Sequence, residues 1–118
     1  MKKYKLGLVE SKFADIIWAN EPLSTAELVA LCERELRWKR TTTYTVLKKL
    51  GEQGIFQMKN KTVTSLVSRE DYYAVQSEQF VEETFEGSLP AFIAAFTKRR
   101  TLTEEEIAEI RNMIDTAQ

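Results

Sequence analysis

The chain has 118 residues, of which 43% are hydrophobic and 30% are charged. This composition is typical of a folded globular protein and argues against an intrinsically disordered one. No apolar run approaches the ~20 residues that a membrane span needs, and no uninterrupted apolar segment follows Met1-Lys2-Lys3. We therefore expect a cytoplasmic protein without a signal peptide.

The residue counts also limit the chemistry. With no histidine and a single cysteine, Cys32, the chain cannot form an internal disulfide or a Cys/His zinc site, and Ser/His and Cys/His catalysis are excluded. The sequence contains neither a P-loop nor a dinucleotide-binding fingerprint. The acidic run Glu104–Glu106 starts an expected helix, where capping and the macrodipole explain it without a metal. We expect no enzymatic activity, no metal and no cofactor.

Charge is unevenly distributed along the chain, although the net charge is −1. Residues 1–67 hold 12 Lys and Arg against 7 Asp and Glu, whereas residues 68–118 hold 5 against 11. Nucleic-acid binding depends on the local field rather than on the overall charge. The asymmetry predicts a binding domain over residues 1–68 and a domain of a different kind over residues 69–118.

Two helices are expected after a short basic arm at Lys2–Lys5. The first covers residues 8–18, and its apolar face is formed by Val9, Phe13, Ile16 and Ile17. Ser24 and Glu27 have the spacing of a capping box at the start of the second helix. We interpret Cys32, on the apolar stripe of that helix, as a small core residue rather than a reactive thiol.

The third helix, over residues 38–50 (WKRTTTYTVLKKL), carries the strongest functional signal. Its apolar stripe consists of Thr43, Val46, Leu47 and Leu50. The opposite face holds Thr42, Thr45 and Lys49, flanked by Thr41, Tyr44 and Lys48, and no acidic residue lies between Leu36 and Gly51. Hydroxyls and cations contact phosphate oxygens and base edges, so this face predicts DNA binding. The alternative is an ordinary basic surface helix.

A β-hairpin is expected directly after this helix. Gly54 is the expected C′ glycine, and residues 55–58 and 62–67 form two short strands around the tip Lys59-Asn60-Lys61. Three helices followed by a hairpin form the winged variant of helix-turn-helix. Near the start of the third helix, Lys39, Arg40 and Thr41 would hold the DNA backbone, and Lys59 and Lys61 would add phosphate contacts. Trp38 is expected to anchor that helix start in the core.

The second half predicts three amphipathic helices, capped by Ser68, by Ser88 and by Thr103 with Glu106. Their hydrophobic side chains need a partner surface, which a second copy of the chain would supply. The expected dimerisation residues are Tyr72, Phe80, Phe85, Leu89, Phe92, Ile93, Phe96, Ile107, Ile110 and Ile114. The alternative is a monomer in which these helices fold back on the winged domain.

Four stretches together resemble the penicillinase-repressor family of bacterial transcription factors (the BlaI/MecI group) over nearly the whole chain. They are Ile16-Ile17-Trp18, the segment from Trp38 to Gly54, FEGSLPAFIAAF over residues 85–96 and LTEEEIAEI over residues 102–110. The resemblance implies a homodimer that represses a promoter by binding a dyad-symmetric operator. The expected fold is mainly α with a small β-hairpin, in which a winged helix-turn-helix DNA-binding domain precedes a three-helix dimerisation lobe.

The resemblance also bears on regulation. In the beta-lactam-responsive members, a membrane sensor protease cleaves an Asn–Phe bond in the dimerisation lobe. The equivalent bond here is Ala95–Phe96, which keeps the phenylalanine but not the asparagine. Copper-responsive members carry a cysteine pair near the carboxyl end, which is missing here. The competing hypotheses are a winged-helix protein–protein interaction module and a regulator with a small-molecule pocket between its lobes.

Overall fold

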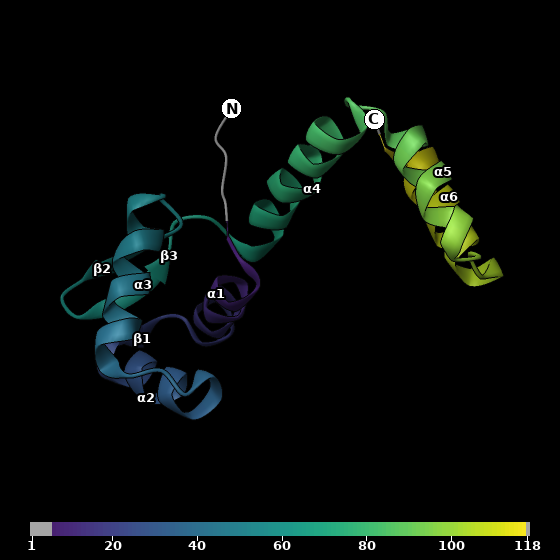
Figure 1. Cartoon of the computed structure of the whole chain (residues 1–118). Helices are drawn as coiled ribbons and strands as arrows, with labels where there is room; N and C mark the ends of the chain where they lie inside the picture. The colour runs from purple at the N-terminus through teal and green to yellow at the C-terminus, as the bar shows by residue number, and fades with distance from the viewer. Residues whose placement is uncertain (1–5, 118) are drawn as a thin grey trace. The chain divides into compact units, whose positions relative to one another are not determined.

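The computed structural model describes residues 6–117, and Figure 1 shows the course of the chain. In this part the elements are α1 (Leu8–Asn20), β1 (Leu23–Ser24), α2 (Thr25–Leu36), α3 (Arg40–Glu52), β2 (Phe56–Lys59), β3 (Thr62–Ser65), α4 (Arg69–Phe85), α5 (Leu89–Arg99) and α6 (Glu104–Thr116). The expected fold class is confirmed. The basic arm at Lys2–Lys5 lies outside the described residues. Among the described helices, none is both long and apolar enough to cross a membrane.

The chain divides into two compact units between Ser77 and Glu78. Helix α4 therefore begins in the first unit and ends in the second. The domain boundary expected between residues 68 and 69 falls at the start of α4, and residues 69–77 belong to the first unit.

The first unit contains a three-stranded antiparallel sheet in the order β1-β3-β2. Strands β2 and β3 form the expected hairpin, in which Lys59 lies opposite Thr62. Asn60 and Lys61 have φ angles of 51° and 60°, so two left-handed residues form the turn. Strand β1 was not expected, because two residues are too short to show the alternation of a strand; its Leu23 is buried opposite Val63.

Apolar side chains from α1, α2, α3 and the sheet form the core of the first unit. Phe13 and Ile17 on α1 and Leu50 on α3 are fully buried. Cys32 is buried as well, and burial raises the pKa of its thiol, which confirms that it is a core residue. The Trp38 ring stacks on Phe13 with centroids 5.4 Å apart, so Trp38 anchors the start of α3 as predicted.

The first turn of α4 is part of the same core. Tyr72 is fully buried, and its ring centroid lies 5.5 Å from that of Trp18. The Trp18 indole donates a hydrogen bond to the Val67 carbonyl at 2.9 Å, and the Arg69 guanidinium lies 3.0 Å from the Asp15 carboxylate. Tyr72 is therefore unavailable to a second copy of the chain, which corrects its place in the expected dimerisation set.

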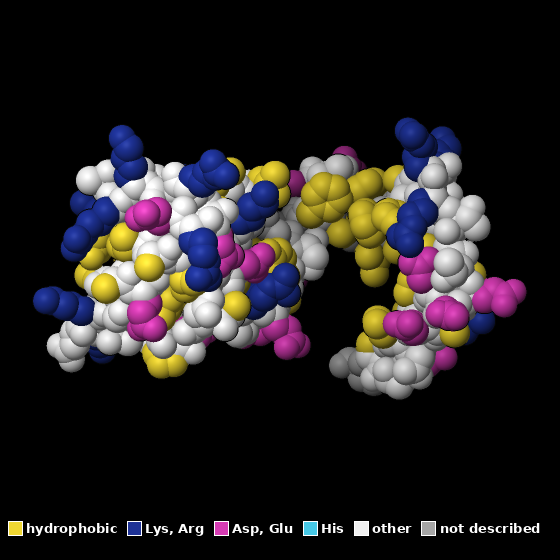
Figure 2. All heavy atoms as spheres, turned by 90° about the horizontal axis from the view of Figure 1, so that it is seen from below, with side chains coloured by type: hydrophobic (Ala, Val, Ile, Leu, Met, Phe, Trp, Pro, Cys, Tyr) yellow, Lys and Arg dark blue, Asp and Glu magenta, His cyan; other side chains and the backbone are white. Residues whose placement is uncertain are grey.

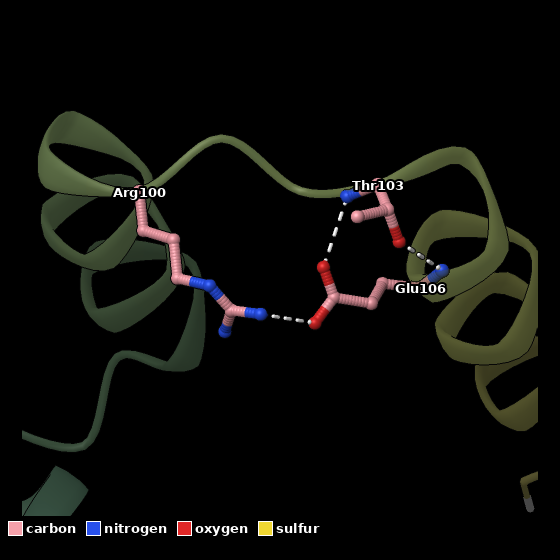
Figure 3. Close-up of polar contacts among 3 residues, drawn as sticks. All are labelled: Arg100, Thr103 and Glu106. Carbon is pink, nitrogen blue, oxygen red and sulfur yellow. Dashed lines mark hydrogen bonds and ion pairs between the residues drawn. The ribbon is translucent and has the colours of Figure 1, made fainter.

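The second unit consists of the end of α4, α5 and α6. The expected caps are present: the Ser88 hydroxyl accepts from the Ala91 N–H at 3.1 Å, and Thr103 and Glu106 form a capping box. Arg100 donates to the same Glu106 carboxylate at 2.7 Å, across the turn between α5 and α6 (Figure 3). This carboxylate therefore fixes the turn from both sides.

Candidate nucleic-acid interface

Helix α3 has the two faces that its sequence predicts. Thr43, Leu47 and Leu50 are buried against the first unit, with Val46 half-buried beside them. The opposite side is exposed over Thr41, Thr42, Thr45, Lys48 and Lys49, and Tyr44 lies half-buried at its edge. From Thr41 to Lys49 the exposed face therefore presents hydroxyls and ammonium groups, and the acidic Glu52 follows only at the last residue of the helix.

The start of α3 differs from the start of α2. In α2 the Ser24 hydroxyl accepts from the Glu27 N–H at 3.0 Å, and the Glu27 carboxylate accepts from the Ser24 N–H at 2.9 Å. In α3 the N-cap residue Lys39 makes no side-chain capping bond, and Arg40 stands in a first turn that lacks an acid. Cations here oppose the helix macrodipole, so this end attracts an external anion.

The threonine hydroxyls on α3 are partly committed to the backbone. The Thr45 hydroxyl donates to the Thr41 carbonyl at 2.9 Å, which leaves its oxygen lone pairs and its methyl group facing outward. Such a group can accept from an amino group on a base edge or contact a thymine methyl. Thr45 is thus suited to base contact, as the sequence predicts.

Lys49 is held by a partner that the sequence does not reveal. Its ammonium nitrogen lies 2.6 Å from a carboxylate oxygen of Glu10 on α1. Glu10 also accepts from the Gly7 N–H at 3.0 Å. The bond from Lys49, and then that from Gly7, holds the pKa of Glu10 below its usual range. Lys49 therefore presents a partly neutralised charge.

The hairpin tip is fastened to the start of α2. The Thr25 N–H donates to the Lys61 carbonyl at 3.0 Å, and Ser24 pairs with Thr62 in the sheet. Lys59 and Lys61 are both exposed at this tip. The two lysines are thus carried on a fixed turn rather than on a free loop.

The second unit has a cluster of phenylalanine rings and a set of exposed apolar side chains, and together these include all the expected dimerisation residues other than Tyr72. Phe80, Phe85 and Phe92 meet edge to face, with centroids 5.6 to 5.9 Å apart. Large apolar side chains that stay exposed are Phe80, Leu89, Ile93, Phe96, Ile107, Ile110, Met113 and Ile114. Figure 2 shows hydrophobic side chains uncovered on this unit and Lys and Arg side chains projecting from the first unit. Ala95 and Phe96 lie inside α5, both exposed.

Two residues that the sequence did not mark as functional contact the predicted site from other helices. Glu10 on α1 and Thr25 on α2 contact Lys49 and Lys61 from 39 and 36 residues away, and no local pattern signals either contact. Within the described residues, no group of three or more His, Cys, Asp or Glu side chains is arranged to hold a metal ion.

The arrangement of three helices, a β-hairpin and a second, helical unit defines a winged helix-turn-helix protein. A sequence model of the penicillinase repressor family matches residues 6–116, and the chain belongs to this family of transcriptional repressors. It is 25% identical to the methicillin resistance regulatory protein MecI of Staphylococcus aureus strain Mu50, over 97% of this chain and 96% of that protein. It is 23% identical to the penicillinase repressor of Bacillus licheniformis, over 98% and 94% of the two chains.

Proposed function

We propose that this repressor binds dyad-symmetric operator DNA as a homodimer, with α3 in the major groove of each half-site. The observation that carries the proposal is the exposed face of α3 from Thr41 to Lys49, which has five hydroxyl or ammonium side chains; the helix's one acid, Glu52, is its last residue. Its uncapped, cationic first turn supports the same function. A protein-binding winged domain would have no need of such a face.

The residues of the interface have separate roles in this proposal. Thr42 and Thr45 face the base edges, and Lys48 and Lys49 lie further along the same helix. Lys39, Arg40 and Thr41 hold the DNA backbone at the start of α3. Lys59 and Lys61 contact phosphates from the wing, meaning the hairpin tip Lys59–Lys61. Because Lys49 is already paired with Glu10, we rank it below the two threonines as a base-reading residue.

The exposed apolar side chains of the second unit support a homodimer. Phe96, Ile107 and Ile110 are each more than one-third exposed, and α5 and α6 have no buried residue in the isolated chain. Burying apolar surface against a second copy is favourable by about 25 cal/mol per Å². A two-fold dimer would present two recognition helices, as a dyad-symmetric operator requires.

Release of the repressor by a membrane sensor protease would involve the Ala95–Phe96 bond. This bond lies within α5, and the Phe96 carbonyl accepts from the Arg100 N–H at 3.2 Å. Proteases commonly bind their substrates as extended chains, so cleavage here requires α5 to open locally. The exposure of both residues favours access once it has opened.

The test is a selection of duplexes from random DNA by the purified full chain, followed by affinity measurements at several salt concentrations. We expect inverted half-sites separated by about one helical turn or a multiple of it, and a steep linear fall of log affinity with log salt. Selection of no consensus, together with salt-independent binding, would contradict the proposal and favour a protein-interaction module.

A further inference from the structure

A cleft opens between the start of α2, the start of α3 and the hairpin tip. Its volume is ≈530 Å³. Its lining includes Thr25 and Val29 from α2, Arg40 and Tyr44 from α3, and Met58 and Lys61 from the hairpin. All six belong to the first unit, so the cleft is a property of the winged domain itself.

The polar side of the cleft suits an anion. The Arg40 guanidinium carbon lies 5.6 Å from the centroid of the Tyr44 ring, and Lys61 lines the same space. The Thr25 hydroxyl, and then Arg40, lower the pKa of Tyr44, which makes its phenol a stronger hydrogen-bond donor. No Asp or Glu is among the residues that line the cleft. Two cations and a polarised phenol are therefore available to one phosphate group.

The other side of the cleft is apolar. Val29 and Met58 contribute hydrocarbon surface to the same lining, and Met58 is about half exposed, at 52%. A free phosphate ion would leave this surface wet. A sugar-phosphate unit has both an anion and a largely apolar ring face, so it matches both sides.

The backbone holds Lys61 ready for this contact. Its carbonyl accepts from the Thr25 N–H, and its φ of 60° is left-handed. Glycine is preferred at this second position of a two-residue hairpin turn, so a lysine here carries backbone strain. Strained residues are common at binding sites, so a strained lysine at this turn supports a role for Lys61 in binding an anion.

We propose that Arg40, Tyr44 and Lys61 close around one backbone phosphate in each operator half-site, with its sugar against Val29 and Met58. This assigns Tyr44 to the DNA backbone rather than to a base edge. The inference rests on the proposed function, because it requires that the first unit bind duplex DNA.

The test replaces single phosphates of a selected duplex by uncharged methylphosphonate linkages, one at a time. The full chain should lose about tenfold in affinity at one linkage per half-site, as expected for a charge-assisted hydrogen bond. Tyr44→Phe and Lys61→Met should each bind the unmodified duplex more weakly and be less sensitive to that linkage than the unmodified chain. Lys59→Met is the matched control: it removes the other hairpin cation, lies outside the cleft lining, and should stay sensitive to the same linkage.

Equal sensitivity of the unmodified chain and both cleft variants at every linkage would overturn this assignment and leave operator binding intact. Selection of no duplex at all would instead contradict the proposed function. If inorganic phosphate at constant ionic strength gave a saturable shift of the Tyr44 ring signals by NMR, and no single linkage mattered, the cleft would bind a free anion and the assignment would be wrong. Unfolding temperatures of the variants, expected unchanged, exclude misfolding as the cause of a loss.

Discussion

The ammonium group of Lys49 on α3 lies 2.6 Å from the carboxylate of Glu10 on α1. The pair joins the C-terminal half of the proposed recognition helix to the first turn of the chain's first helix. Lys49 is still 56% exposed, so the pair restrains this cation without removing it from the surface. If α3 binds DNA as we propose, Glu10 competes with a DNA phosphate for the charge of Lys49.

Replacing Glu10 by Gln should strengthen DNA binding, because Lys49 is then released to a phosphate. The slope of log affinity against log salt should steepen by about 0.9, the value for one added phosphate contact. The free energy of unfolding should fall by no more than about 1 kcal/mol, as is usual for an exposed pair. Fluorescence anisotropy at several salt concentrations measures the first effect, and urea denaturation measures the second.

Asp15→Asn is the matched control for this variant. It removes another α1 carboxylate, whose partner at 3.0 Å is Arg69 on α4 rather than a residue of α3. The control should leave the salt slope unchanged. An identical slope in Glu10→Gln and the unmodified chain would show that Lys49 does not reach DNA.

The same ion pair predicts how stability depends on pH. Because the pKa of Glu10 is lowered in the folded protein, its contribution is present above its unfolded pKa of about 4.3 and is lost as the pH falls through the folded value. Between pH 6 and pH 3, the Glu10→Gln variant should therefore lose less stability than the unmodified chain. Urea midpoints across this range measure the difference. Parallel losses would mean that Glu10 titrates alike in the folded and unfolded states.

Much of the fold could be predicted from local sequence signals. Capping residues such as Ser24 and Thr103, the positive-φ Gly54 and the hairpin tip all act within a few residues, and each lies where the sequence places it. Strand β1 could not be predicted, since its two residues form a strand only through pairing with β3. Tyr72 has the spacing of an interface residue, but the neighbouring Trp18 draws it into the core of the first unit.

The sequence predicts which side chains make up the candidate site, but not which partners they contact. The periodicity of α3 identifies which residues are exposed, because burial follows the 3.6-residue repeat. It does not reveal which of them are already bonded, so Lys49 and Thr45 look equivalent in sequence. Their difference depends on Glu10, which lies 39 residues away in the chain.

Replacing Thr45 by Ala should weaken binding by about 1–3 kcal/mol and relax the preference at one base pair of each half-site. The reason is that its methyl and hydroxyl oxygen face outward while its proton is donated to Thr41. Affinities for a panel of single-base operator variants measure the effect. Thr97→Ala is the control, since the Thr97 hydroxyl donates to the Ile93 carbonyl at 2.8 Å in the same way, on α5. A uniform loss on all sequences would assign Thr45 to the backbone.

Placing a charge on the exposed apolar surface of the second unit should separate the proposed dimer. Ile114→Asp changes a side chain that is 65% exposed in the isolated chain, so the monomer has room for the carboxylate, whereas a dimer interface would bury it unpaired. Sedimentation should report monomers, and operator affinity should fall because the two half-sites are no longer bound together. Leu8→Asp is the control: Leu8 is 76% exposed on α1 of the first unit and should leave the dimer intact. An unaltered sedimentation coefficient for Ile114→Asp would place the interface elsewhere.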